Sequence, residues 1–230
     1  MSVQSDLQKL ADKEKASFLQ RFFKTGKGEY AEGDKFLGIT VPKQREVAKK
    51  YKELPLSDVE TLIHSPLHEY RLTGLLILCG KFAKADELMQ KKIVDLYLAN
   101  TKYINNWDLV DLSSHEIIGG WLFTHPKERS LLLALAKSKH LWERRIAMIS
   151  TFEFLRHGEW KDTLAIGELL LHDDHDLIHK AVGWGLREVG KRNLSAEEEF
   201  LKKHYKTMPR TMLRYAIEKF PESKRKFYMN

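Results

Sequence analysis

The sequence predicts an all-α fold built from repeated pairs of helices, in a single domain spanning residues 1–230. Three observations support this prediction. Patterns typical of strands are almost absent, apolar residues recur at helical spacing along nearly the whole chain, and the helical pattern itself repeats. The spacing is clearest in the apolar runs Leu131–Leu135, Leu164–Ile166 and Leu169–Leu171. About twelve helices of roughly 10–18 residues, joined by short polar connections, account for the sequence.

Capping residues, early prolines and acidic residues mark where individual helices begin. In chain order, the expected starts are Thr40 before Pro42, Ser57 before Asp58, His125 before Pro126, and Ser195 before a run of glutamates. We expect one long helix to precede the segment Thr25–Gly38, which holds four of the thirteen glycines. This segment is interpreted as an ordered loop or a broken short helix, and such segments often carry function.

The helices repeat with a period of 34–39 residues. Arg145 and Lys180 are 35 residues apart, and Arg214 follows after 34 more. Arg71 fits the same pattern about two periods before Arg145. A degenerate two-helix repeat of this length is typical of HEAT- and armadillo-like helical-repeat solenoids, in which the second helix of each pair lines a concave face. Because a basic residue recurs near the start of that inner helix, the sequence predicts a concave basic groove.

The composition is that of an ordinary globular protein. Apolar residues make up 43% and charged residues 31% of the 230 residues, which excludes disordered, collagenous and low-complexity chains. The single cysteine, Cys79, excludes an intramolecular disulfide and a cysteine-based zinc site, and its apolar neighbours favour a buried side chain. We find no signal peptide and no apolar run of about 18 residues, so we expect a cytoplasmic protein without membrane contact.

The net charge of +7 lies in the C-terminal segment 202–230, which holds nine basic and two acidic residues. Residues 1–201 are neutral overall. A basic end indicates a polyanionic partner such as nucleic acid. The alternative is a solvated basic helix at the end of the chain, and charge alone leaves both interpretations open.

Three short stretches carry residues that packing alone explains poorly. In the first, Trp107 and Asp111 are four residues apart and share a helix face. The second, Leu141–Arg145, ends in an Arg-Arg pair, of which one guanidinium would face the groove. In the third, Lys180–Glu188, Trp184 lies between two glycines that would leave its ring faces uncovered. Each stretch has a structural alternative: a buried tryptophan, a surface carboxylate, or an arginine that ties neighbouring repeats together.

A histidine-rich stretch offers a possible metal site. His172, His175 and His179 have a spacing that could supply metal ligands. The stretch falls at a predicted turn between repeat helices, however, where Asp174 or Asp176 would cap the next helix. We therefore expect no metal and no cofactor. Motifs for nucleotide binding, hydrolytic triads and zinc peptidases are absent from the sequence.

Taken together, these stretches resemble the AlkD family of DNA alkylation-repair glycosylases, which are all-helical proteins of HEAT-like repeats. The resemblance runs over most of the chain. It begins with Tyr30 and Phe36–Pro42 and includes Trp107–Asp111, Trp142–Arg145 and Lys180–Glu188. The patterns Trp-Asp-x-x-Asp and Gly-Trp-x-Leu-Arg-Glu are specific in combination.

The resemblance implies a hydrolase of base excision repair. Such an enzyme excises purines alkylated at N3 or N7, such as 3-methyladenine and 7-methylguanine, from double-stranded DNA without flipping the base. The implied residues are the catalytic aspartate Asp111, the lesion-facing Trp107 and Trp184, a phosphate contact at Arg145 or the adjacent Arg144, and a tyrosine contact at Tyr30. Three further basic residues are expected to bind DNA: Lys180, Arg187 and Arg214. The expected form is a monomer in the bacterial cytoplasm, associated with the nucleoid.

The residue types suit this chemistry. Alkylation makes the purine cationic, so the base leaves without further protonation and the sugar becomes cationic in turn. The Asp111 carboxylate could offset that charge and orient water, and the indole faces of Trp107 and Trp184 could attract the same cation. Two other functions remain open on the sequence: a helical-repeat scaffold that binds a protein, and a DNA-binding relative without glycosylase activity.

Overall fold

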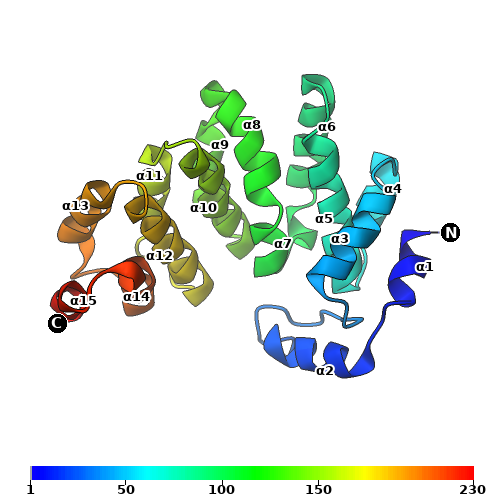
Figure 1. Ribbon diagram of the computed structural model, residues 1–230, viewed down its shortest axis with the longest axis horizontal. Helices are drawn as coiled ribbons and strands as arrows, with labels where there is room; N and C mark the ends of the chain where they lie inside the picture. The colour runs from blue at the N-terminus through cyan, green and yellow to red at the C-terminus, as the bar shows by residue number, and fades with distance from the viewer. Residues whose placement is uncertain (1) are drawn as a thin grey trace. The chain divides into compact units, whose positions relative to one another are not determined.

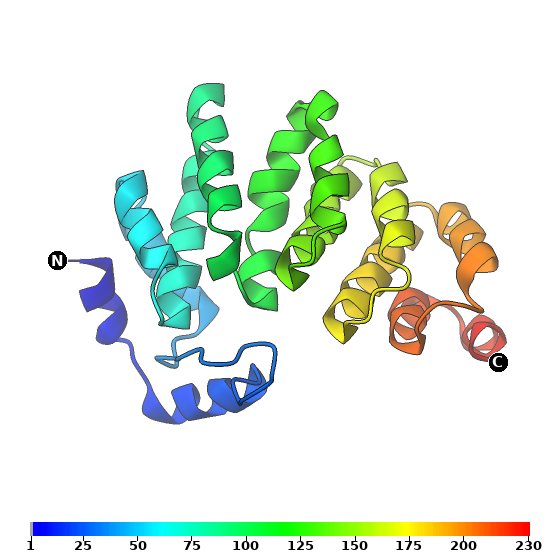
Figure 2. The same cartoon turned by 180° about the vertical axis from the view of Figure 1, so that it is seen from behind.

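The computed structural model describes residues 2–230, and every regular element in this range is helical. Figures 1 and 2 show the ribbon from opposite sides. Among the described residues, the β-type pairing is limited to one isolated parallel bridge between Lys35 and Leu67. The predicted all-α helical-repeat fold is therefore confirmed. The chain divides into two compact units, residues 1–117 and residues 118–230.

The first unit is built around a buried helix, α5. Its elements are α1 (Val3–Gln8), α2 (Lys13–Phe22), α3 (Val41–Lys50), α4 (Leu56–Ile63), α5 (His68–Phe82), α6 (Glu87–Ala99), the 3₁₀ turn η1 (Thr101–Tyr103) and α7 (Trp107–Asp111). Both α3 and α4 pack against α5, and every residue of α5 from His68 through Cys79 is buried. Because α5 is enclosed, its apolar residues lie all round the helix instead of along one stripe.

The glycine-containing segment is an ordered loop, which folds back along α2 (Figure 2). The Asp12 N–H donates to the Leu37 carbonyl at 2.8 Å. Gly38 has a φ of 84°, and a Cβ on this residue would lie 2.1 Å from the Asp12 carbonyl oxygen, so only glycine fits. The expected single first helix is wrong. Asp12 interrupts it, because its side chain caps α2 by accepting the Lys15 N–H at 3.1 Å.

The second unit contains the repeat that the sequence predicts. Its elements are α8 (Gly120–Thr124), the 3₁₀ turn η3 (Pro126–Glu128), α9 (Ser130–Ala136), α10 (Leu141–Arg156), α11 (Lys161–Leu169), α12 (Asp176–Gly190), α13 (Leu194–His204), α14 (Arg210–Ala216), η4 (Ile217–Lys219) and α15 (Glu222–Met229). The helices α10, α12 and α14 begin at residues 141, 176 and 210, so their starts are 35 and 34 residues apart. In this unit α12 packs against α10, α11, α13 and α14. A π-helical turn, η2 (His115–Gly119), spans the boundary of the two units.

Some helix starts differ from expectation. Thr40 precedes α3 as predicted. Helix α13 begins after Asn193 instead of Ser195, because the Asn193 side chain accepts the N–H three residues later at 3.0 Å. Helix α4 begins after Pro55, which holds an extended backbone, so Ser57 already lies in the first turn. Pro126 begins only a 3₁₀ turn. No helix in residues 2–230 is long and apolar enough to cross a membrane.

Candidate functional site

The first unit holds three of the predicted site residues, and two of them share helix α7. Trp107 and Asp111 are the first and last residues of this five-residue helix, so the predicted one-turn spacing is confirmed. Both side chains are half-buried. The Trp107 Nε1–H donates to the Tyr30 Oη at 3.3 Å, so the loop brings Tyr30 onto the same indole. Phe23 stacks on Trp107 with ring centroids 5.1 Å apart.

Beneath α7 lies a buried cluster of charges that the sequence interpretation missed. His68 Nε2 is 2.8 Å from an Asp108 carboxylate oxygen, and His68 Nδ1 is 3.1 Å from Asp34. Arg71 donates to the second Asp34 oxygen at 2.6 Å and to the Ser65 carbonyl at 3.0 Å. The four residues are each at most 7% exposed. We refer to Asp34, His68, Arg71 and Asp108 as the buried ionic network.

Electrostatics in this network favour the charged forms. Burial by itself lowers the pKa of His68, but the carboxylates of Asp108 and Asp34 outweigh it and raise this pKa to about 9. Burial raises the pKa of Asp34, and His68 and Arg71 outweigh that effect, so the pKa of Asp34 is lowered. His68 and Asp34 therefore favour their charged forms at neutral pH, and the formal charges of two carboxylates and two cationic side chains sum to zero. This balance is what makes burial of four charges tolerable.

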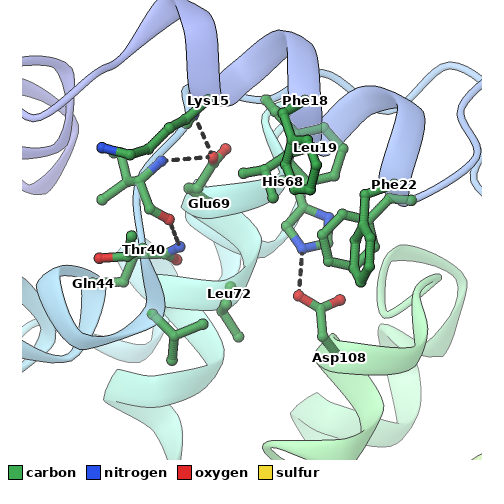
Figure 3. A pocket seen from close by; sticks show the side chains of 15 residues that line it. Lys15, Phe18, Leu19, Phe22, Thr40, Gln44, His68, Glu69, Leu72 and Asp108 are labelled. Atoms are coloured by element: carbon green, nitrogen blue, oxygen red, sulfur yellow. Dashed lines mark hydrogen bonds and ion pairs between the residues drawn. The ribbon is translucent and has the colours of Figure 1, made fainter.

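An apolar cleft of about 380 Å³ opens beside the network, between α2 and helices α3 and α5. Figure 3 shows Phe18, Leu19 and Phe22 of α2 over the cleft and the His68–Asp108 hydrogen bond at its base. Phe18 and Phe22 are 57% and 53% exposed, which is unusual for aromatic rings. Several polar side chains of the lining form hydrogen bonds within the protein. For example, the Glu69 carboxylate accepts the N–H groups of residues 37, 38 and 39.

In the second unit, Trp184 lies on α12, half-buried and edge-on to Phe152, with ring centroids 4.7 Å apart. Its two flanking glycines lie close to atoms of neighbouring helices. A Cβ on Gly183 would lie 2.4 Å from the Met212 carbonyl oxygen, and one on Gly185 would lie 2.1 Å from the Met148 Cε. Gly183 therefore allows α12 to approach the backbone of α14 closely, whereas the nearest atom to Gly185 is the end of the flexible Met148 side chain. That the two glycines leave the faces of the Trp184 ring uncovered stays a prediction.

The predicted basic residues of the second unit mostly have partners within it. Arg145 is 5% exposed and donates to the Leu177 carbonyl at 2.6 Å, just inside the next repeat. Arg144 forms an ion pair with Asp173 at 2.6 Å. The remaining partners are Asp176 for Lys180, Glu218 for Arg187 and the Thr211 hydroxyl for the exposed Arg214. Of the basic residues that recur at this spacing, Arg145 joins α10 to α12, whereas the partners of Lys180 and Arg214 lie in their own helices.

The histidine-rich stretch caps a helix. His175 is the N-cap residue of α12, and its Nδ1 accepts the Leu177 N–H at 3.1 Å. The sequence instead predicts that Asp174 or Asp176 caps this helix. His179 Nε2 hydrogen-bonds to the Asp173 carbonyl. Within residues 2–230, no group of three or more histidine, cysteine or acidic side chains is arranged to hold a metal ion.

Residues 3–220 match the sequence model of a family described as DNA alkylation repair enzymes. The chain belongs to this family. A solved structure described as a predicted DNA alkylation repair enzyme from Enterococcus faecalis has a similar fold. Its TM-score is 0.73 at 17% sequence identity, and the match covers 92% of this chain and 97% of that chain. At this identity the likeness establishes the fold alone. No curated protein matches the chain.

Membership of the DNA alkylation repair enzyme family implies DNA binding, and the first unit has a basic hollow. A hollow of about 460 Å³ lies between α3 and α5. Four exposed cations line it, with Glu116 as the acidic residue of the lining: Arg45, Lys49, Lys52 and Lys84. Sequence reasoning missed this cluster because residues 1–201 are neutral in total. The helical spacing of residues 45, 49 and 52 places them on one face and could have indicated the cluster.

The buried ionic network of this DNA repair protein predicts an alkaline loss of stability. In the folded protein the pKa of His68 is about 9, above its ordinary value of 6.5. The protonated ring therefore contributes its full stabilisation below about pH 6.5, and this contribution disappears as the pH rises through about 9. Urea unfolding at pH 7, 8, 9 and 10 should give a falling free energy of unfolding. A flat profile across this range would contradict a charged His68.

Proposed function

We propose that the chain is a DNA glycosylase that hydrolyses the N-glycosidic bond of purines carrying a positive charge from N3 or N7 alkylation. 3-Methyladenine and 7-methylguanine in duplex DNA are the proposed substrates. The observation that carries the proposal is helix α7, which holds an indole and a carboxylate one turn apart with Tyr30 on the indole. Membership of the DNA alkylation repair enzyme family supports the same conclusion.

The chemistry follows from the charge of the lesion. A cationic purine needs no general acid to leave, so the enzyme must stabilise the oxocarbenium-like sugar and supply a water molecule. Asp111 can do both, because a carboxylate stabilises a nearby cation and can deprotonate water. The face of Trp107 attracts the same cation, with about 0.5–2 kcal/mol per contact. We assign Trp184 the same role on the resemblance of its Gly-Trp-x-Leu-Arg-Glu pattern.

The proposal includes excision without base flipping. A pocket that receives a flipped base reads it with free donors and acceptors. In the apolar cleft beside α7, three buried polar side chains are engaged elsewhere: His68 with two carboxylates, Glu69 with three backbone N–H groups, and Gln44 with the Ile39 carbonyl at 2.8 Å. These hydrogen bonds leave His68, Glu69 and Gln44 little capacity to recognise a purine edge.

The decisive experiment measures the release of free 7-methylguanine from duplex DNA by the purified chain. Release that depends on Asp111 supports the glycosylase. Binding of the duplex without release would identify a DNA-binding relative without this activity. A chain that neither binds the duplex nor releases base would be a protein-binding scaffold, and the proposal would fail.

Duplex affinity should depend steeply on salt. If the basic hollow of the first unit and the basic C-terminal segment together contact about six phosphates, the slope of log K against log [salt] is about −5. Replacing both Lys49 and Lys52 with glutamine should make this slope less negative by about 2, for damaged and undamaged duplex alike. Lys91→Gln on α6, where Lys91 pairs with Asp95, is the matched control and should leave the slope unchanged. A slope near zero for the unmodified protein would contradict phosphate binding.

A further inference from the structure

Helix α7 cannot hold its own orientation. It has five residues, and so short a helix is unstable in isolation. Local capping contributes little, since the Asn106 side chain accepts only the N–H of Trp107, at 2.8 Å. The direction in which Trp107 and Asp111 point must therefore be set by contacts with other parts of the first unit.

Asp108 supplies the strongest of these contacts. One of its carboxylate oxygens accepts the Leu109 N–H of α7 at 2.9 Å, and the other faces His68 of α5 at 2.8 Å. His68 continues to Asp34 in the loop between α2 and α3. A single imidazole therefore joins α7, α5 and the loop that carries Tyr30.

The charge state of that imidazole follows from geometry. Both ring nitrogens of His68 face carboxylate oxygens, and an ionised carboxylate only accepts hydrogen bonds. Both nitrogens must therefore carry a proton. A neutral ring would lack the proton for one of its two hydrogen bonds to carboxylates. Asp34, Asp108 and Arg71 would then leave a net negative charge buried in the protein.

Aromatic rings extend the same connection to the indole. Phe36 stacks on His68 with ring centroids 4.5 Å apart, and Phe23 lies 5.2 Å from His68 on one side and 5.1 Å from Trp107 on the other. Phe23 and Phe36 also stack on each other, 5.0 Å apart. A displacement of His68 would therefore reach Trp107 by two routes, through Asp108 and through Phe23.

We propose that His68 is a positioning residue: as a buried imidazolium between Asp34 and Asp108, it holds α7 so that Trp107 and Asp111 keep the geometry that excision requires. The excision part rests on the proposed glycosylase function. His68 itself touches neither DNA nor the reacting atoms, because it is 2% exposed and enclosed by rings and carboxylates. Figure 3 shows it beneath α2 with its hydrogen bond to Asp108.

The test compares the full-length protein with His68→Gln and Asp108→Asn. The matched control is His157→Gln, which removes an exposed imidazole that hydrogen-bonds to Glu153 in the second unit. For each protein, affinity for undamaged duplex and the single-turnover rate of 7-methylguanine release are measured far below the unfolding temperature. The emission of Trp107 is isolated from the other four tryptophans by subtracting the spectrum of the corresponding Trp107→Phe protein.

We expect release to slow by about tenfold or more in His68→Gln and Asp108→Asn, because small displacements of catalytic groups are costly. Duplex affinity should change by less than about threefold, because the phosphate contacts lie elsewhere. The Trp107 emission should shift in both variants, and His157→Gln should match the unmodified protein in every measurement. A purely structural role would lower the melting temperature without changing the release rate or the Trp107 emission of the folded protein, and that result would overturn the proposal.

Two measurements do not depend on catalysis. Nitrogen NMR of the unmodified protein at pH 7 should find both ring nitrogens of His68 protonated, and a neutral ring would overturn the proposal. If the unmodified protein releases no base, the proposed function fails, while NMR and Trp107 emission still decide the positioning role. If the single variants do not fold, His68→Gln with Asp34→Asn restores a neutral network. That double variant should fold with shifted Trp107 emission, and unchanged emission would contradict the inference.

Discussion

Asp111→Asn should slow the release of 7-methylguanine by about 10²–10³-fold, which corresponds to a loss of about 3–4 kcal/mol of transition-state stabilisation. The substitution keeps the shape of the side chain at the end of α7 and removes its charge. The amide can neither offset a cationic sugar nor accept a proton from water. Affinity for the duplex should stay the same or rise, because a negative charge has been removed from a surface that meets phosphates.

Asp95→Asn is the matched control, since this carboxylate lies exposed on α6 and pairs with Lys91. Its release rate should equal that of the unmodified protein. The same argument limits the substrates: without a general acid, neutral lesions such as hypoxanthine and 1,N6-ethenoadenine should remain in the DNA. Two outcomes would refute the mechanism. One is a folded Asp111→Asn protein with a nearly unchanged rate, and the other is efficient excision of hypoxanthine.

Gly183→Ala should destabilise the second unit by about 3 kcal/mol, at the upper end of the usual cost of overpacking. The added Cβ would lie 2.4 Å from the Met212 carbonyl oxygen and 2.5 Å from the Tyr215 Cβ. Backbone atoms of α14 cannot move aside as a flexible side chain can, so α12 and α14 must separate. The measurement is the free energy of unfolding in urea.

Gly80→Ala is the control for this substitution. Gly80 lies in α5, and a Cβ there would meet no atom within 4 Å. Alanine should be neutral or stabilise the protein by up to about 1 kcal/mol, because glycine is a weak helix former. If Gly183→Ala were as stable as the unmodified protein, the close packing of α12 on α14 would not explain the glycine.

The second unit illustrates what a periodic sequence pattern can and cannot predict. The spacing of Arg145, Lys180 and Arg214 predicts repeat helices, and α10, α12 and α14 begin 35 and 34 residues apart. The same spacing does not predict which acceptor each guanidinium or ammonium group contacts. Arg145 reaches the Leu177 carbonyl and Lys180 pairs with Asp176, because a long flexible side chain takes the nearest acceptor that folding provides. The concave basic groove remains a prediction.

The sequence by itself determined the helical class, the repeat in the second unit and the one-turn spacing of Trp107 and Asp111, because these depend on periodicities along the chain. Only the tertiary structure decided the buried ionic network, whose members come from residues 34, 68, 71 and 108. Each of these residues is an ordinary surface type when considered singly. They form the buried ionic network only when folding brings the loop, α5 and α7 together. Burial then requires that their charges balance.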